Sequence, residues 1–133
     1  MKPLEYYIAL YEKHTGEEFG LNDNFTFHYH PEHGFCEYCV YKNCLYIWQM
    51  CGELKYWIDL AYKTCQKFDI PKICSYIVRK PRPFIRALGF KVYRDEDRNG
   101  DIKYWATNKQ DEELTATPIG DRYIFTWEVK LGV

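Results

Sequence analysis

The chain has 133 residues, enough for one domain with a hydrophobic core, and we expect a single domain over residues 1–133. Its formal net charge of -1 does not favour nucleic acid or an anionic membrane as a partner, and any surface for them would have to be local. No apolar run approaches the roughly 20 residues of a membrane span, and Glu5 and Glu12 interrupt the segment where a signal peptide would be apolar. We therefore expect a cytoplasmic protein without membrane contact, whose six cysteines are free thiols.

The first part of the chain predicts a helix and three strands. An apolar stripe at helical spacing marks the helix, and apolar runs between turn residues mark the strands. The expected ranges are residues 3–15, 25–30, 35–42 and 44–50. The last of these runs, CLYIWQM, is nearly all apolar, which is typical of a central strand buried on both faces.

The middle of the chain predicts a strand–helix–strand unit over residues 44–78. Apolar residues recur at helical spacing over 53–68, and the β-branched run KICSYIV at 72–78 predicts the second strand. Such a βαβ unit joins two parallel strands through a right-handed crossover.

The last part predicts a short helix, opened by Pro81 and Pro83, and then four antiparallel strands. The expected ranges are residues 81–88, 90–95, 102–107, 113–117 and 122–129, with Asn99-Gly100 as a hairpin turn. The fold class is therefore α/β, with a mixed sheet of the α+β kind around the central βαβ unit. Because exposed strand edges invite pairing, we also expect that the last strands allow a homodimer.

The junction between the buried strand and the long helix is the candidate ligand site. It holds Gln49 and Gly52 just before the helix. A helix N-terminus presents unpaired N–H groups and a partial positive charge, and a glycine lets the backbone approach an anion. The alternative interpretation is a tight strand-to-helix turn without a ligand.

Two short motifs resemble those of the GCN5-related N-acetyltransferase (GNAT) superfamily. Gln49-x-x-Gly52-x-Leu54 is similar to the family motif Gln/Arg-x-x-Gly-x-Gly/Ala, and it departs from that motif at Leu54. The stretch from Phe84 to Phe90 resembles the family's late helix with its Gly-Phe step. The resemblance covers about Cys44 to Tyr93 and looks closest to diverged, phage-type members.

The resemblance implies an acyl-CoA N-acyltransferase-like fold in which the two parallel strands splay apart. In the family, the pantetheine of acetyl-CoA lies in the gap and its pyrophosphate caps the helix. Carried over, Ile47, Trp48 and Gln49 line the pantetheine, and Gly52, Glu53, Leu54 and Lys55 face the pyrophosphate. An aspartate at position 52 is then expected to abolish cofactor binding without unfolding the chain.

A basic run, Arg79-Lys80-x-Arg82, follows the second strand of the unit. Arginine forks match phosphate oxygens, so Arg79 and Arg82 are candidate ligands for the phosphates of the cofactor. The alternatives are a solvated charged loop and a contact to a nucleic-acid backbone, and the nearby acidic residues 95–97 weigh against the second.

Amine acetylation needs a general base for the ammonium and a general acid for the leaving thiolate. Glu37 is the candidate base, with an exposed strand residue as the alternative interpretation. The family often places its acid, a tyrosine, where this chain has Ile85, so Tyr76 is the candidate acid, with Tyr46 as an alternative.

Two stretches have spacings similar to those of metal sites. Cys36-x-x-Cys39 with nearby histidines has a zinc-like spacing, but residues three apart on a strand point to opposite faces. Residues 95–101 copy half of a calcium loop, and a hairpin turn explains them as well. We expect no metal.

Two functions follow from these patterns. The first is an acetyl-CoA-dependent N-acyltransferase acting on an unknown amine acceptor. The second is a catalytically inactive binding or structural protein on the same fold, with a phage-type origin. A zinc-dependent interaction module is a third alternative.

Overall fold

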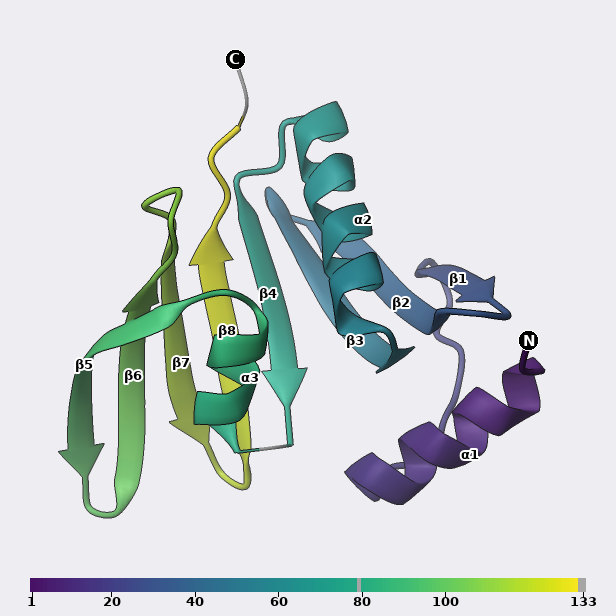
Figure 1. The fold of residues 1–133 in the computed structure, drawn as a ribbon, viewed down its shortest axis with the longest axis horizontal. Coiled ribbons are helices and arrows are strands. Elements are labelled where there is room, and N and C mark those ends of the chain that lie inside the picture. The colour runs from purple at the N-terminus through teal and green to yellow at the C-terminus, as the bar shows by residue number, and fades with distance from the viewer. Residues whose placement is uncertain (79, 132–133) are drawn as a thin grey trace.

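The computed structural model describes residues 1–78 and 80–131. Within these residues the chain forms three helices and eight strands, and Figure 1 shows their arrangement. The elements are α1 (Leu4–Thr15), β1 (Thr26–His30), β2 (Gly34–Tyr41), β3 (Cys44–Gly52), α2 (Leu54–Phe68), β4 (Lys72–Ile77), α3 (Pro81–Ala87), β5 (Lys91–Arg98), β6 (Asp101–Thr107), β7 (Glu113–Ile119) and β8 (Arg122–Glu128). The sequence predictions of these elements are confirmed, with boundaries that differ by up to three residues.

The eight strands form one mixed sheet in the order β1-β2-β3-β4-β8-β7-β6-β5. β3 and β4 are parallel and joined through α2, which confirms the predicted βαβ unit, and the other neighbouring strands are antiparallel. The edges of the sheet are β1 and β5. β7 and β8 each lie between two other strands, so neither offers the free edge that such pairing needs, and the homodimer stays a prediction.

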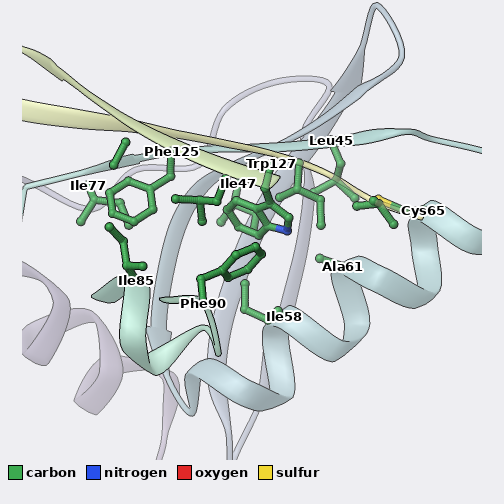
Figure 2. Packing of buried hydrophobic residues seen from close by; sticks show 14 of the residues in the cluster. Leu45, Ile47, Ile58, Ala61, Cys65, Ile77, Ile85, Phe90, Phe125 and Trp127 are labelled. Carbon is green, nitrogen blue, oxygen red and sulfur yellow. The ribbon is translucent and has the colours of Figure 1, made fainter. Parts of the chain in front are cut away.

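The main hydrophobic core lies between one face of the sheet and the helices α2 and α3, which lie in front of the sheet in Figure 1. Figure 2 shows Leu45 and Ile47 of β3 together with Phe125 and Trp127 of β8, above the Ile58 side chain of α2. Each of the four strand residues has at most 2% of its surface exposed, so these strands are held rigidly against the helices.

A second, smaller core lies between α1 and the β1–β2–β3 part of the sheet. It consists of Tyr7, Tyr11 and Phe35, with Phe19, Phe27 and Cys51 packed against it. Phe35 belongs to this cluster, whereas the next residue, Cys36, belongs to the main core. Because successive strand residues point to opposite faces, α1 and α2 cover opposite faces of the sheet.

Candidate functional site

The parallel pair at the centre of the sheet is paired over only part of its length. The ladder runs from Cys44 opposite Lys72 to Ile47 opposite Ser75, although β3 continues to Gly52. Figure 1 shows the strands close together where they start and separated at their arrowheads. Among the residues that the structure describes, none of β3 beyond Ile47 is paired with β4.

A β-bulge accounts for this change of direction. The β2–β3 register shifts between Glu37 and Tyr38, which pair with Gln49 and Ile47, so Trp48 is the extra residue. A bulge bends its strand and increases the local twist. The bend carries the end of β3 away from β4, at the point where the β3–β4 ladder stops.

A cavity of about 830 Å³ lies between the separated ends of β3 and β4, and we call it the gap. Its walls include Tyr11 and Thr15 of α1 as well as Phe84 and Ala87 of α3. These helices lie on different faces of the sheet, so the gap passes through the sheet rather than resting on one side of it.

The start of α2 is at one end of the gap, where Gly52 and Leu54 line the wall. The side chain of Glu53, the N-cap residue, makes no capping hydrogen bond, and the first turn holds no acidic residue. The first N–H groups of a helix need partners from outside it. The Glu53 carboxylate turns instead to His33, with Oε1 3.2 Å from Nδ1.

Gly52 has a structural role. Its φ is +107°, and a Cβ atom placed there would lie 2.1 Å from the carbonyl oxygen of His33. Only glycine adopts this backbone without strain, and no side chain fits against the neighbouring strand. The expectation that an aspartate at this position leaves the fold intact is therefore wrong.

Two buried side chains fasten the loop after α1 to the open end of the sheet. Glu37 accepts hydrogen bonds from the backbone N–H of Asn22 (2.8 Å), from its side-chain amide (3.0 Å) and from Nε2 of Gln49 (2.7 Å). Gln49 also donates to the carbonyl of Gly20 at 2.6 Å and accepts from its N–H at 3.4 Å. We call Gly20, Asn22, Glu37 and Gln49 together the loop latch. Glu37 is 1% exposed, so the interpretation of an exposed strand residue is wrong.

An ion pair spans the gap on the α1 side. Arg122 Nη2, at the start of β8, lies 2.6 Å from Glu17 Oε1 in the loop after α1. Both residues line the gap, together with Glu18. The pair links the β1–β2–β3 half of the sheet to the β4–β8 half where the two strands separate.

The structure brings part of the expected site together. Ile47, Trp48 and Gln49 line the gap, as does Tyr76, which is 39% exposed. Glu53 and Lys55 belong to the start of α2 but do not line the gap.

The other expected residues lie elsewhere. Arg82 does not line the gap: its guanidinium bonds Asp95 at 3.1 Å and lies over the Tyr104 ring, next to β5 and β6. Arg79 lies outside the described residues. Tyr46 faces away from the gap, and Ile85, at 1% exposed, belongs to the main core.

Several residues of the gap were missed by the sequence analysis. Ser75, which is buried opposite Ile47, and the walls from α3 and the loop 17–22 are among them. A serine within an otherwise apolar strand is a signal that could have identified Ser75. Arg122 carries no such signal, because its place depends on how β8 pairs with β4.

Tyr11 of α1 is a polar residue in the wall of the gap. Burial, with a smaller effect from Glu17, raises the pKa of its hydroxyl to about 12. The hydroxyl therefore stays protonated at neutral pH.

The six cysteines are free thiols, as expected. Cys36 lies in the main core, where burial raises the pKa of its thiol to about 12, whereas Cys39 points to the other face. Among residues 1–78 and 80–131, no three His, Cys, Asp or Glu side chains gather as a metal site would require. Residues 95–101 form the β5–β6 hairpin, in which Asp97 accepts the N–H of Gly100 at 2.8 Å.

Comparisons with known proteins found no matching family model, no matching curated protein and no matching solved structure. In the part of the chain that the structure describes, no helix is both long and apolar enough to cross a membrane. The geometry of the gap is therefore the basis for a function.

Proposed function

We propose that the protein is an acetyl-CoA-dependent N-acyltransferase with an acyl-CoA N-acyltransferase-like fold. The observation that carries the proposal is the gap, which opens where the β3–β4 ladder ends and reaches the start of α2. The resemblance of Gln49-x-x-Gly52 to the GNAT motif implies a cofactor site at this place.

The residues of the gap fit the acyl donor in three respects. The backbone groups of β3 beyond Ile47 need hydrogen-bond partners, and the amides of pantetheine provide both donors and acceptors. The apolar side chains of Ile47, Phe84 and Ala87 in the wall suit the alkyl parts of pantetheine. The start of α2, without an acidic residue in its first turn, suits a pyrophosphate.

When bound, acetyl-CoA would supply an acetyl thioester that an amine can attack. In the transfer, the amine nitrogen would form a bond to the carbonyl carbon as the bond from that carbon to sulfur breaks, and the proton that the nitrogen loses would pass to a carboxylate in the wall of the gap, for which Glu18 is the candidate. The N–H groups of β3 beyond the end of the ladder are the candidates that would stabilise negative charge on the thioester oxygen. Tyr76, in the wall of the gap, is the candidate donor of the proton that the leaving thiolate takes up.

Glu37 is better explained as a positioning residue than as the general base. Both of its carboxylate oxygens accept hydrogen bonds from Asn22 or Gln49 of the loop latch, and its side chain does not line the gap. Glu18 lines the gap, and its carboxylate is the candidate base for an amine entering from the α1 side.

The second candidate function is a binding protein that holds acyl-CoA without turnover. The observation that favours it is Ile85, which occupies the family's tyrosine position and is buried in the main core. An acid at that position is therefore absent from this chain.

An acetyl-transfer assay separates the two functions. The protein is incubated with acetyl-CoA and a set of primary amines, and the release of free CoA thiol is followed with time. We expect release that depends on the amine and falls about a hundredfold in Tyr76→Phe but not in the distant Tyr93→Phe. Acetyl-CoA binding without amine-dependent release would favour the binding protein.

A further inference from the structure

A second cavity, of about 420 Å³, lies on the face of the sheet that α2 and α3 leave uncovered. It is formed by the loop before β1 and by β2, β3 and β4, and we call it the aromatic pocket. Five aromatic residues line it: Phe25, Tyr41, Tyr46, Trp48 and Tyr76.

The rings of the aromatic pocket meet edge to face. The Trp48 ring lies 6.1 Å from Phe25 at 69° and 5.8 Å from Tyr76 at 69°, measured between ring centroids. Yet Trp48 is 48% exposed, Tyr41 60% and Tyr76 39%. Aromatic rings that are held in place but not covered leave faces and edges for another ring.

The chemistry of the lining favours an uncharged, planar occupant. The described residues that line the aromatic pocket carry no acidic or basic side chain, and the polar ones are Asn24, Cys39 and the tyrosines. The Lys42 ammonium already lies 5.4 Å from the centroid of the Tyr41 ring. A ligand cation in the pocket would meet that charge without a carboxylate to balance it.

The aromatic pocket adjoins the gap. Trp48 and Tyr76 line both cavities, so a ligand that extends past these two rings enters the gap. On the α1 side of the gap it meets Glu18 and the Glu17–Arg122 pair. An ammonium group is therefore better placed in the gap and a neutral ring in the aromatic pocket.

We propose that the aromatic pocket binds the aromatic ring of the amine acceptor, so that the acceptor is a primary amine on a short chain attached to a planar, uncharged ring. This inference rests on the proposed function, because it needs the acyl donor in the gap. The volume of about 420 Å³ accommodates one or two fused rings.

The test compares two amines that differ only in the saturation of the ring, 2-phenylethylamine and 2-cyclohexylethylamine. Each is titrated into the full chain while the indole N–H signals of the four tryptophans are followed by NMR. We expect 2-phenylethylamine to shift the Trp48 signal and to bind about two- to tenfold more tightly than its saturated partner. The signal of Trp105, on β6, is the internal control and should not move.

A pair of variants shows whether the ring occupies the pocket. Tyr41→Ala removes an exposed wall and should weaken the binding of 2-phenylethylamine about three- to tenfold. Tyr93→Ala removes a ring of similar exposure on β5 and should leave the binding of 2-phenylethylamine unchanged. No shift of Trp48 up to about 10 mM, equal affinities for the two amines, or equal effects of the two variants would overturn the inference.

A separate titration with acetyl-CoA keeps the two proposals apart. Acetyl-CoA binding with no response of Trp48 to 2-phenylethylamine leaves the proposed function standing and overturns the aromatic site. Binding of 2-phenylethylamine without acetyl-CoA binding overturns the acceptor role of the site together with the proposed function.

Discussion

The two ends of the β3–β4 pair differ sharply, although they belong to the same two strands. At the paired end, Leu45 and Ile73 lie opposite each other and both are fully buried. At the open end, Trp48 and Tyr76 are roughly half and two-fifths exposed and face cavities. One end is thus part of the core, and the other lines the two cavities where we propose that ligands bind.

The difference shows how a small local change opens a cavity at the end of a core element. The bulge at Trp48 turns β3, and Gly52 lets the end of β3 lie against the turn before β2. The paired end keeps the geometry rigid, while the open end leaves backbone groups unpaired. Substitutions at the paired end should therefore affect stability, and substitutions at the open end should affect binding.

The largest effect is expected from Leu45→Ala at the paired end. Leu45 is 0% exposed within the main core, so its removal loses buried apolar surface and leaves a cavity. We expect the free energy of unfolding to fall by about 3 kcal/mol, measured by urea denaturation. The dissociation constant of acetyl-CoA for the folded variant should stay the same. A fall of less than about 1 kcal/mol in the free energy of unfolding would mean that the paired end is not tightly packed.

Gly52→Ala at the open end should be nearly as destabilising. The added Cβ meets the His33 carbonyl oxygen, and alanine disfavours a φ of +107°, so we expect a loss of about 2–3 kcal/mol in the same measurement. Gly100→Ala is the matched control, because its φ is +92° but no atom lies within 4 Å of the added Cβ. Equal losses in the two variants would show that the close approach to His33 contributes nothing.

Glu37→Gln tests the loop latch. The new amide places an NH₂ group opposite the N–H donors of Asn22 and Gln49, so we expect a loss of about 2 kcal/mol. Glu128→Gln, at an exposed position of β8, should change the stability by less than about 0.5 kcal/mol. If Glu37→Gln abolished acetyl transfer with unchanged stability, Glu37 would be a catalytic base and not a positioning residue.

Sequence patterns were sufficient to predict the helices, the strands and the parallel pair, because periodicity and apolar runs are local. They did not predict the loop latch, since a buried Glu37 depends on a loop that folds back over β2. They assigned Gly52 to a phosphate, although a positive φ and a close backbone contact explain this glycine. The motif lies at the junction that borders the gap, but the contacts across this junction arise from elements distant in the chain.

Trp48→Ala should separate binding from stability. Trp48 is half exposed, so we expect the free energy of unfolding to change by less than about 1 kcal/mol. It lines the gap, so we expect the dissociation constant of acetyl-CoA to rise about tenfold. Trp105→Ala on β6 should leave that constant unchanged, and an equal rise in both variants would argue against a site at the open end.

The smallest effect concerns alkaline pH and Tyr11. The unfolded chain loses the Tyr11 proton near pH 10, whereas burial raises the pKa in the folded state to about 12. The contribution of this pKa difference to the free energy of unfolding is complete below pH 10 and is lost as the pH rises toward 12. Between pH 9 and 10.5 the Tm of the wild-type protein should fall by roughly 2 °C more than that of Tyr11→Phe, as followed by circular dichroism. If the Tm values of the two proteins fell in parallel, Tyr11 would have the same pKa in the folded and unfolded states.

The central claim is that the open end of the β3–β4 pair is a site for acetyl-CoA. Its most direct test is calorimetric titration of the purified protein with acetyl-CoA, with CoA as the comparison ligand. The account predicts one-to-one binding of both ligands with a dissociation constant in the micromolar range. No heat of binding for either ligand up to millimolar concentrations would contradict the claim, and the gap would then serve another ligand or none.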